Sequence, residues 1–219
     1  MSALVHSNDK ILLIVAHPDD EVMFFGPLLA STQRLSILCL STGNYEGLGK
    51  TRMEELNKCA EVFNIPSRNV SIIDHQMLQD GMETHWPLDV IEGIVFDHIK
   101  SNEYNKIFIF DEYGISGHPN HIAASLGSQK AIKKLRTSCP FSQLKAYKLS
   151  SRNVVRKFLG IFEVIIVLFL FRERYCLLCW QPWKIVQGMK CHRSQFVWFR
   201  QIFIFISIYT YINSYKEVI

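Results

Sequence analysis

The chain has 219 residues, 48% of them hydrophobic and 20% charged, which indicates a globular protein long enough for one α/β domain with a full core. Its net charge of +4 is uneven, because residues 1–150 carry 14 Lys/Arg against 17 Asp/Glu and residues 151–219 carry 10 against 3. The basic part also holds 15 of the 27 aromatic residues but no recognised nucleic-acid motif, so we expect a membrane surface and no nucleic acid as its partner.

The N-terminal residues and the cysteines indicate whether the protein is secreted and whether it contains disulfides. Residues 1–9 contain no apolar core of signal-peptide length, so we expect no secretory signal and six reduced cysteines. Cys176 and Cys179 form a C-x-x-C pair among apolar residues. Without a second Cys or His pair nearby, this pair predicts core packing rather than a zinc site.

The first 150 residues alternate apolar runs with helical patterns. Strands that alternate with helices in this way predict a three-layer α/β/α, Rossmann-like fold with a mostly parallel sheet. We expect one domain over residues 1–219, with residues 151–219 as an extension that packs on the 1–150 core or on a membrane. In chain order the patterns predict a strand at 11–15, a helix at 22–30, a strand at 35–40, a helix at 50–63, a strand at 70–74, a helix at 87–100, a strand at 106–110, a helix at 121–135 and a strand at 144–149.

A charged cluster follows the first predicted strand. The sequence Ala-His-Pro-Asp-Asp-Glu at 16–21 places one imidazole and three carboxylates directly after the apolar run. In open α/β sheets, ligands bind outside the carboxyl ends of strands, so this loop lies where such a fold keeps its chemistry. A helix N-terminus carrying acids is the structural alternative. It explains one or two of the acids, but neither His17 nor the turn at Pro18.

A second cluster, Gly-His-Pro-Asn-His at 117–121, follows the fourth predicted strand. Pro119 suits the first position of a helix, which puts His118 at the cap and His121 one turn in, on the same side. Alone, this pattern is equally typical of histidines that cap or solvate a helix. Because parallel strands point their carboxyl ends one way, we expect both clusters at one edge of the sheet. Two His and one Asp there would form the open zinc site of a hydrolase, with another carboxylate and another His for proton transfer.

Four motifs together carry a family resemblance. They are Ala-His-Pro-Asp-Asp-Glu at 16–21, Gly43-Asn44 with Thr51-Arg52-x-x-Glu55, Gly-His-Pro-Asn-His at 117–121, and Cys-His-Arg-Ser-Gln at 191–195. Over residues 10–150 and 188–213 the chain resembles the N-acetylglucosaminyl-phosphatidylinositol de-N-acetylases, the PIG-L group of the LmbE-like zinc N-deacetylases. The resemblance implies hydrolysis of the N-acetyl group of N-acetylglucosaminyl-phosphatidylinositol in GPI anchor biosynthesis, at the cytoplasmic face of the endoplasmic reticulum membrane.

The resemblance also implies roles for individual residues. It implies one zinc ion per chain, held by His17, Asp20 and His121. It implies Asp19 as the general base and His118 as the acid or oxyanion stabiliser.

Substrate contacts are implied by the same resemblance for Arg52, Asn44 and His192, the last in a motif expected to close the site. The chain departs from the family pattern at Ser116, where some bacterial relatives have a catalytic Tyr. Tyr113 is a candidate substitute.

Family members usually begin with a membrane-spanning helix, and this sequence predicts none. Residues 158–171 are apolar apart from Gly160 and Glu163, but these fourteen residues are fewer than the roughly 20 that span a bilayer. We interpret them as a core segment or an interfacial patch.

Two other classes of function fit parts of the sequence. A nucleotide-binding α/β domain fits the architecture, but acids rather than a Gly-rich loop follow the first predicted strand, and acids repel phosphate. A non-catalytic membrane-binding or partner-binding module fits the basic, aromatic C-terminal part. Two alternatives to the expected deacetylase stay open. The substrate is another N-acetylglucosaminyl conjugate, or this isoform is catalytically inactive. The sequence predicts no oligomeric state.

Overall fold

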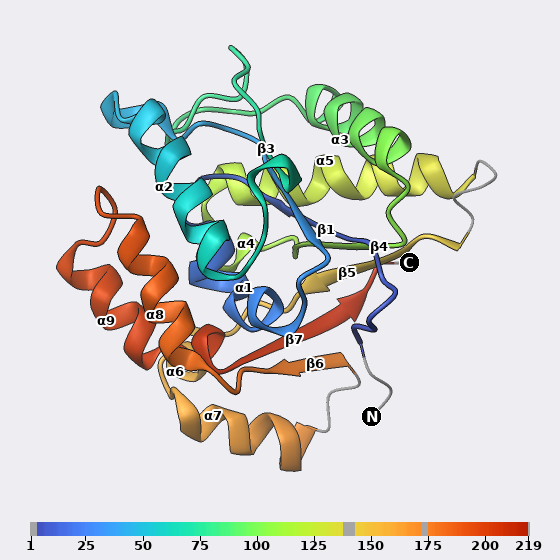
Figure 1. The fold of residues 1–219 in the computed structure, drawn as a ribbon. Coiled ribbons are helices and arrows are strands. Elements are labelled where there is room, and N and C mark those ends of the chain that lie inside the picture. Colours follow the sequence, from blue (N-terminus) through green and yellow to red (C-terminus); the bar gives the residue numbers. More distant parts are fainter. Residues whose placement is uncertain (1–3, 138–142, 172–174, 219) are drawn as a thin grey trace.

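The computed structural model describes residues 4–137, 143–171 and 175–218 (Figure 1). The strands in these ranges are Ile11–Val15 (β1), Leu35–Cys39 (β2), Val70–Ile72 (β3), Lys106–Phe110 (β4), Lys145–Leu149 (β5), Tyr175–Leu178 (β6) and Ile212–Glu217 (β7). They form one sheet in the order β3-β2-β1-β4-β5-β7-β6. Strands β1 to β5 are parallel, and β7 pairs antiparallel with β5 and β6.

Helices cover both faces of this sheet (Figure 1). Alternate residues of β1 point to opposite faces, so Leu13 joins one core cluster and Leu12 the other. One face is covered by α1 (Asp20–Ser31), α2 (Gly49–Val62) and α8 (Pro182–Cys191), and the other by α3 (Leu88–Asn102) and α5 (Pro119–Arg136). The predicted three-layer α/β/α fold with a mostly parallel sheet is confirmed.

The shorter elements lie in the connections. They are η1 (Asn44–Glu46), η2 (Ser67–Asn69), α4 (Gly114–Gly117), α6 (Val154–Lys157), α7 (Ile161–Ile165), the π-helical η4 (Ile166–Phe171), α9 (Trp198–Ile206) and η5 (Ile208–Thr210).

Several predicted boundaries differ from the structure by one or two residues. The first helix begins at Asp20 rather than at residue 22, because Asp20 and Glu21 form its first turn. Acids are favourable there, since a helix N-terminus carries partial positive charge. The third strand ends at Ile72 rather than at residue 74.

The C-terminal part is built into the sheet and into one helical layer. Strand β7 lies between β5 and β6, and the buried amide of Asn213 donates to the carbonyl of Phe24 in α1 at 2.8 Å. Helix α8 packs closely on α1 at Gly26, where an added Cβ would lie 2.5 Å from the Ile185 side chain. Cys176 and Cys179 pack against the core, as predicted.

The apolar segment at 158–171 divides into an inner and an outer side. Val164 and Val167 are buried, whereas Phe162 and Phe169 are 69% and 71% exposed. Among the residues that the structure describes, no helix combines the length and the apolar composition needed to cross a bilayer.

Candidate active site

The loop after β1 is shaped by the carboxylate of Asp20. This side chain is buried, and its Oδ2 accepts the backbone N–H of Ala16 at 3.1 Å and that of His17 at 2.8 Å. Asp19, the cap of α1, has a φ of 116°, a left-handed conformation that is strained for a residue other than glycine. The N–H of Asp19 donates to Oε2 of Glu21 at 2.9 Å, which helps to hold this backbone in place.

Three side chains from the two predicted clusters converge on one point. Nδ1 of His17 lies 3.3 Å from Nε2 of His121, which lies 3.1 Å from Oδ1 of Asp20. All three residues are buried, and each offers a ligand atom within 4.8 Å of the others. The structure therefore brings together two imidazole nitrogens and one carboxylate, which is a donor set suited to zinc.

In each imidazole, the outer ring nitrogen, which is the one facing away from the shared point, has a partner of its own. Nε2 of His17 lies 3.0 Å from Oδ1 of Asp80, and Nδ1 of His121 lies 3.0 Å from the carbonyl oxygen of Gly114. When the outer nitrogens donate to these acceptors, the inner nitrogens keep their lone pairs toward the shared point. Sequence reasoning missed Asp80, which lies in the loop after β3 outside any motif.

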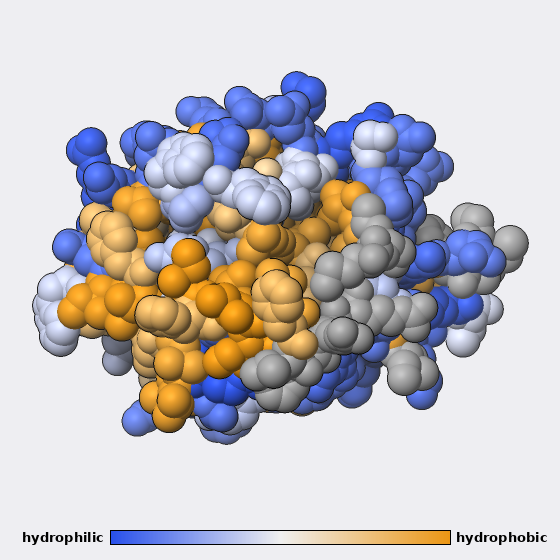
Figure 2. Space-filling model, turned by 90° about the horizontal axis from the view of Figure 1, so that it is seen from below, coloured by the Kyte–Doolittle hydropathy of each residue, from blue (hydrophilic) through white to orange (hydrophobic). Residues whose placement is uncertain are grey.

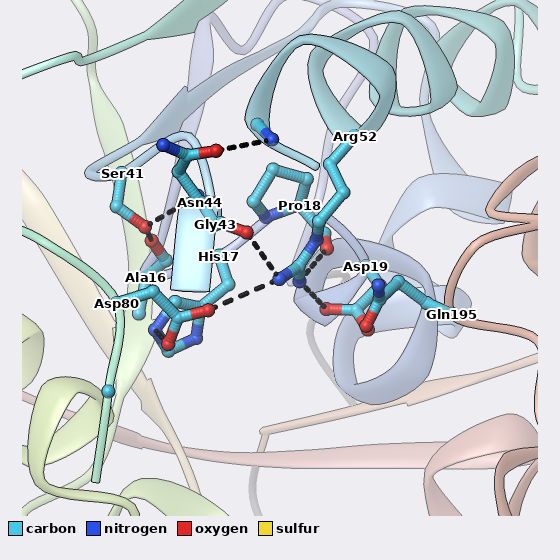
Figure 3. A network of polar contacts seen from close by, with 12 residues as sticks. Ala16, His17, Pro18, Asp19, Ser41, Gly43, Asn44, Arg52, Asp80 and Gln195 are labelled. Atoms are coloured by element: carbon cyan, nitrogen blue, oxygen red, sulfur yellow. Dashed lines mark hydrogen bonds and ion pairs between the residues drawn. The ribbon is translucent and has the colours of Figure 1, made fainter. Parts of the chain in front are cut away.

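Arg52 of α2 connects several loops at this edge of the sheet (Figure 3). Its Nη1 donates to the carbonyl of Gly43 at 2.9 Å and to Oδ2 of Asp80 at 3.2 Å. Its Nη2 donates to the carbonyl of Pro18 at 2.7 Å and to Oδ1 of Asp19 at 3.3 Å. The guanidinium is buried, and these four contacts support a positioning role. Because Arg52 also lines the adjoining cleft, the substrate contact that the resemblance implies stays a prediction.

The two adjacent aspartates have pKa values shifted in opposite directions. Burial raises the pKa of Asp19, although two nearby guanidinium groups oppose the shift. Burial also acts to raise the pKa of Asp20, but the imidazoles of His121 and His17 overcome it and hold that pKa well below its ordinary value. Asp19 is therefore the better proton acceptor of the two.

His118 caps α5 and adjoins the converging residues. Its Nδ1 accepts the backbone N–H of Asn120 at 3.2 Å, and its ring lies 5.0 Å from the ring of His121, centroid to centroid, on the predicted side of the helix. Burial, together with the neighbouring imidazoles, lowers the pKa of His118 to about 4. The imidazole is then neutral at neutral pH, with its proton on Nε2.

His192 pairs with Glu21, in the first turn of α1. It is fully buried, and its Nε2 lies 2.7 Å from Oε1 of Glu21, the acid that also accepts the N–H of Asp19. Ser194 connects the motif at 191–195 to α2. Both its backbone N–H and its hydroxyl donate to the Glu55 carboxylate, at 2.8 and 2.6 Å. These contacts support a positioning role for His192, and the substrate contact implied by the resemblance stays a prediction.

The remaining predicted residues lie around the rim. The exposed Asn44 uses its Oδ1 to accept the N–H of Gly49, at the start of α2. Ser116 Oγ lies 3.4 Å from Nδ1 of His121, and Tyr113 is exposed. A cleft of about 140 Å³ adjoins the site, lined by Gly43, Tyr45, Glu46, Leu48, Arg52, Asp80, Gln195 and Arg200.

Comparison with known proteins begins with the fold. The N,N'-diacetylchitobiose deacetylase of Pyrococcus horikoshii superposes with a TM-score of 0.68 at 12% identity, covering 96% of this chain and 84% of that one. The 4-carboxy-2-hydroxymuconate hydratase of Pseudomonas putida gives a TM-score of 0.63 at 13% identity, with 96% of each chain covered. The chain is therefore an α/β protein with the LmbE-like deacetylase fold, which by itself does not fix an activity.

Sequence comparison gives the family. The family described as "PIG-L: GlcNAc-PI de-N-acetylase" matches residues 12–132. The N-acetylglucosaminyl-phosphatidylinositol de-N-acetylase of Bos taurus is 35% identical over 220 residues, covering 97% of this chain and 85% of the bovine one. A probable enzyme of the same name from Dictyostelium discoideum is 34% identical over 240 residues, covering 95% and 93%. The chain belongs to the GlcNAc-PI de-N-acetylase family, and the predicted resemblance is confirmed.

The first prediction concerns the pair His192–Glu21. Although burial opposes it, the Glu21 carboxylate raises the pKa of His192 above the ordinary value of 6.5. The stabilisation from this protonation is fully present below the unfolded pKa and is lost as the pH rises through the folded pKa. His192→Gln keeps a donor but removes the charge. We expect it to lower the free energy of unfolding by about 1.5 to 3 kcal/mol near pH 6, with a smaller loss at higher pH.

Urea denaturation across a series of pH values measures this difference. The exposed His85→Gln serves as the control and should change the free energy of unfolding by less than about 0.5 kcal/mol throughout. A loss in His192→Gln that stays constant as the pH rises would show that the pair is not charged as described.

Proposed function

We propose that the chain is a zinc-dependent hydrolase that removes the acetyl group of N-acetylglucosaminyl-phosphatidylinositol in GPI anchor biosynthesis. The observation that carries this proposal is the convergence of His17, Asp20 and His121 beside the buried carboxylate of Asp19. The names of the relatives support the identity of the substrate.

The converging residues fit one zinc ion per chain. Two imidazole nitrogens and one carboxylate are the three-ligand set that leaves a fourth position open. The outer contacts of both imidazoles, to Asp80 and to the Gly114 carbonyl, match the orientation that metal-ligating histidines need. When bound, such an ion polarises a carbonyl oxygen and lowers the pKa of a water molecule beside it.

Asp19 is the residue placed to accept a proton. Its Oδ1 is held by Arg52. Among the described residues, its Oδ2 has no hydrogen-bond donor and lies 3.5 Å from Nη2 of Arg200. A water beside Oδ2 could therefore give a proton to Asp19 as the water oxygen attacks the acetyl carbonyl, and the Asp19 carboxyl would return that proton to the amine nitrogen as the C–N bond breaks and acetate leaves.

His118 is the residue placed to stabilise developing negative charge. Because its Nδ1 accepts the N–H of Asn120, its Nε2 carries the proton of the neutral ring and can donate it in a hydrogen bond. This arrangement supports the oxyanion-stabilising role among the two that the resemblance allowed.

The sugar and its phosphate approach through the cleft beside Arg52 and Asp80, where Tyr45 and Gln195 also line the wall. We place the reaction at the cytoplasmic face of the endoplasmic reticulum membrane, where the lipid part of the substrate stays in the bilayer. The names of the relatives, which point to GPI anchor biosynthesis, support the endoplasmic reticulum as the location.

The second prediction tests the proposed reaction. Purified protein should release acetate from N-acetylglucosaminyl-phosphatidylinositol faster than from other N-acetylglucosaminyl conjugates. Asp19→Asn removes the proton acceptor but no zinc ligand, so it should keep its zinc and lose about 10²-fold or more in kcat.

Asp74→Asn is the matched control, because it makes the same change at an exposed aspartate of the loop that follows β3. Near-normal turnover in Asp19→Asn would show that another group accepts the proton. Acetate release from none of the conjugates by the wild-type protein would contradict the proposed function.

The third prediction concerns Asp80. Without its carboxylate, the outer nitrogen of His17 loses its acceptor, so Asp80→Ala should bind zinc about 10- to 100-fold more weakly than the wild-type protein. Asp80→Asn keeps an acceptor oxygen and should lose less affinity. Competition with a chromophoric chelator measures the zinc affinity, and Asp74→Ala is the control. Wild-type zinc affinity in Asp80→Ala would show that Asp80 does not orient His17.

A further inference from the structure

One face of the molecule exposes an unusual number of large apolar side chains. Figure 2, seen from below the view of Figure 1, shows hydrophobic residues gathered over the side where α7 lies. We call this surface the apolar face and define it as the exposed apolar side chains of residues 154–169 and 202–206. Among them, Val155, Phe162, Phe169 and Phe205 are each more than half exposed.

The two segments of the apolar face lie side by side. The rings of Phe158 and Phe203 are 6.0 Å apart, and Gly160 lies against the backbone of Ile206. Helices α6, α7 and α9 all contact η5, which is buried beneath them. The exposed side chains therefore form one continuous surface rather than scattered single residues.

This surface is additional to the core of the protein. Both segments already bury an inner side, through Val164 and Val167 in one and Ile204 in the other. Their outer apolar side is not needed to fill the interior. Large exposed apolar surfaces on folded proteins mark sites of interaction with another protein or with a membrane.

The charges around the apolar face favour an anionic partner. The described residues of 151–218 include two acids, of which Glu163 is fully buried beside Arg156 and Glu217 lies in β7. The same part of the chain carries basic residues, including Arg152, Lys157 and Arg200. A surface that combines exposed aromatic and aliphatic side chains with basic neighbours suits the interface of a bilayer that contains anionic lipid.

The apolar face also adjoins the candidate active site. Arg200 of α9 approaches the Asp19 carboxylate, and Lys157 of α6 donates to the carbonyl of Ile115 at 2.6 Å, in the loop that leads to His118. Phe24 contacts both Phe203 of α9 and His121, with ring centroids 5.7 Å apart in each case. A bilayer against this face would therefore lie next to the site.

We propose that the apolar face inserts into the interfacial region of a bilayer that contains anionic phospholipid, so that the site meets a lipid-linked sugar at the membrane plane. The identity of that sugar rests on the proposed function. The docking surface itself rests on the exposed side chains of 154–169 and 202–206 and on the charges beside them.

The test is co-sedimentation with vesicles of phosphatidylcholine and phosphatidylinositol. Removing two large apolar side chains in Phe162→Ser/Ile165→Ser should weaken partitioning by about tenfold or more. Added salt should weaken binding of the wild-type protein, because basic residues contribute to it. The matched control is Met77→Ser/Met82→Ser, a change at side chains that are 52% and 66% exposed but lie outside the apolar face, and it should bind like the wild type.

A second variant and a second readout keep the test decisive. Ile202→Ser/Phe205→Ser makes the same change on α9 and should weaken partitioning similarly. Both variants should release acetate at the wild-type rate from a water-soluble N-acetylglucosaminyl-inositol phosphate without acyl chains, which shows that fold and site are intact.

Three results would overturn the docking proposal. The wild-type protein could stay in the supernatant at low salt, or both variants could bind vesicles as tightly as the wild type. Alternatively, sedimentation velocity could show a dimer that both variants dissociate, in which case a second copy covers the face. Vesicle binding as predicted, but without acetate release from any substrate, would instead overturn the proposed function and leave the docking surface in place.

Discussion

The buried guanidinium of Arg52 is the interaction on which the site depends most. It joins the loop after β1 through Pro18 and Asp19, the loop after β2 through Gly43, and the loop after β3 through Asp80. The close approach requires glycine at 43, because an added Cβ there would lie 2.5 Å from the guanidinium carbon and φ is +67°. One cation thereby neutralises carboxylates that would otherwise repel each other, and it fixes the loops that carry the chemistry.

Much of the fold could be predicted from the first 150 residues, because the strands at 11–15 and 106–110 are buried throughout and are apolar except for Lys106. The C-terminal strands could not. Tyr175–Leu178 and Ile212–Glu217 lie at one side of the sheet and pair antiparallel with neighbours distant in sequence, so no local pattern indicated where they belong. The start of α1 was misplaced because the acids of the motif serve as its first helical turn.

The convergence of His17, Asp20 and His121 could be predicted because both motifs follow parallel strands of one sheet. The supporting residues could not, because their roles depend on tertiary contacts. Asp80 stands in a loop without a motif, and the pairing of His192 with Glu21 spans 171 residues. The substrate contacts of Arg52 and His192 were expected from a resemblance alone, whereas their internal partners, which support a positioning role, could not be foreseen from the sequence.

We propose that His17, Asp20 and His121 together hold one zinc ion. Elemental analysis of purified protein tests it most directly. We expect one zinc per chain in the wild-type protein and in His98→Ala, which removes a half-buried histidine of α3. We expect His121→Ala to lose both zinc and activity. Stoichiometric zinc retained in His121→Ala would contradict it.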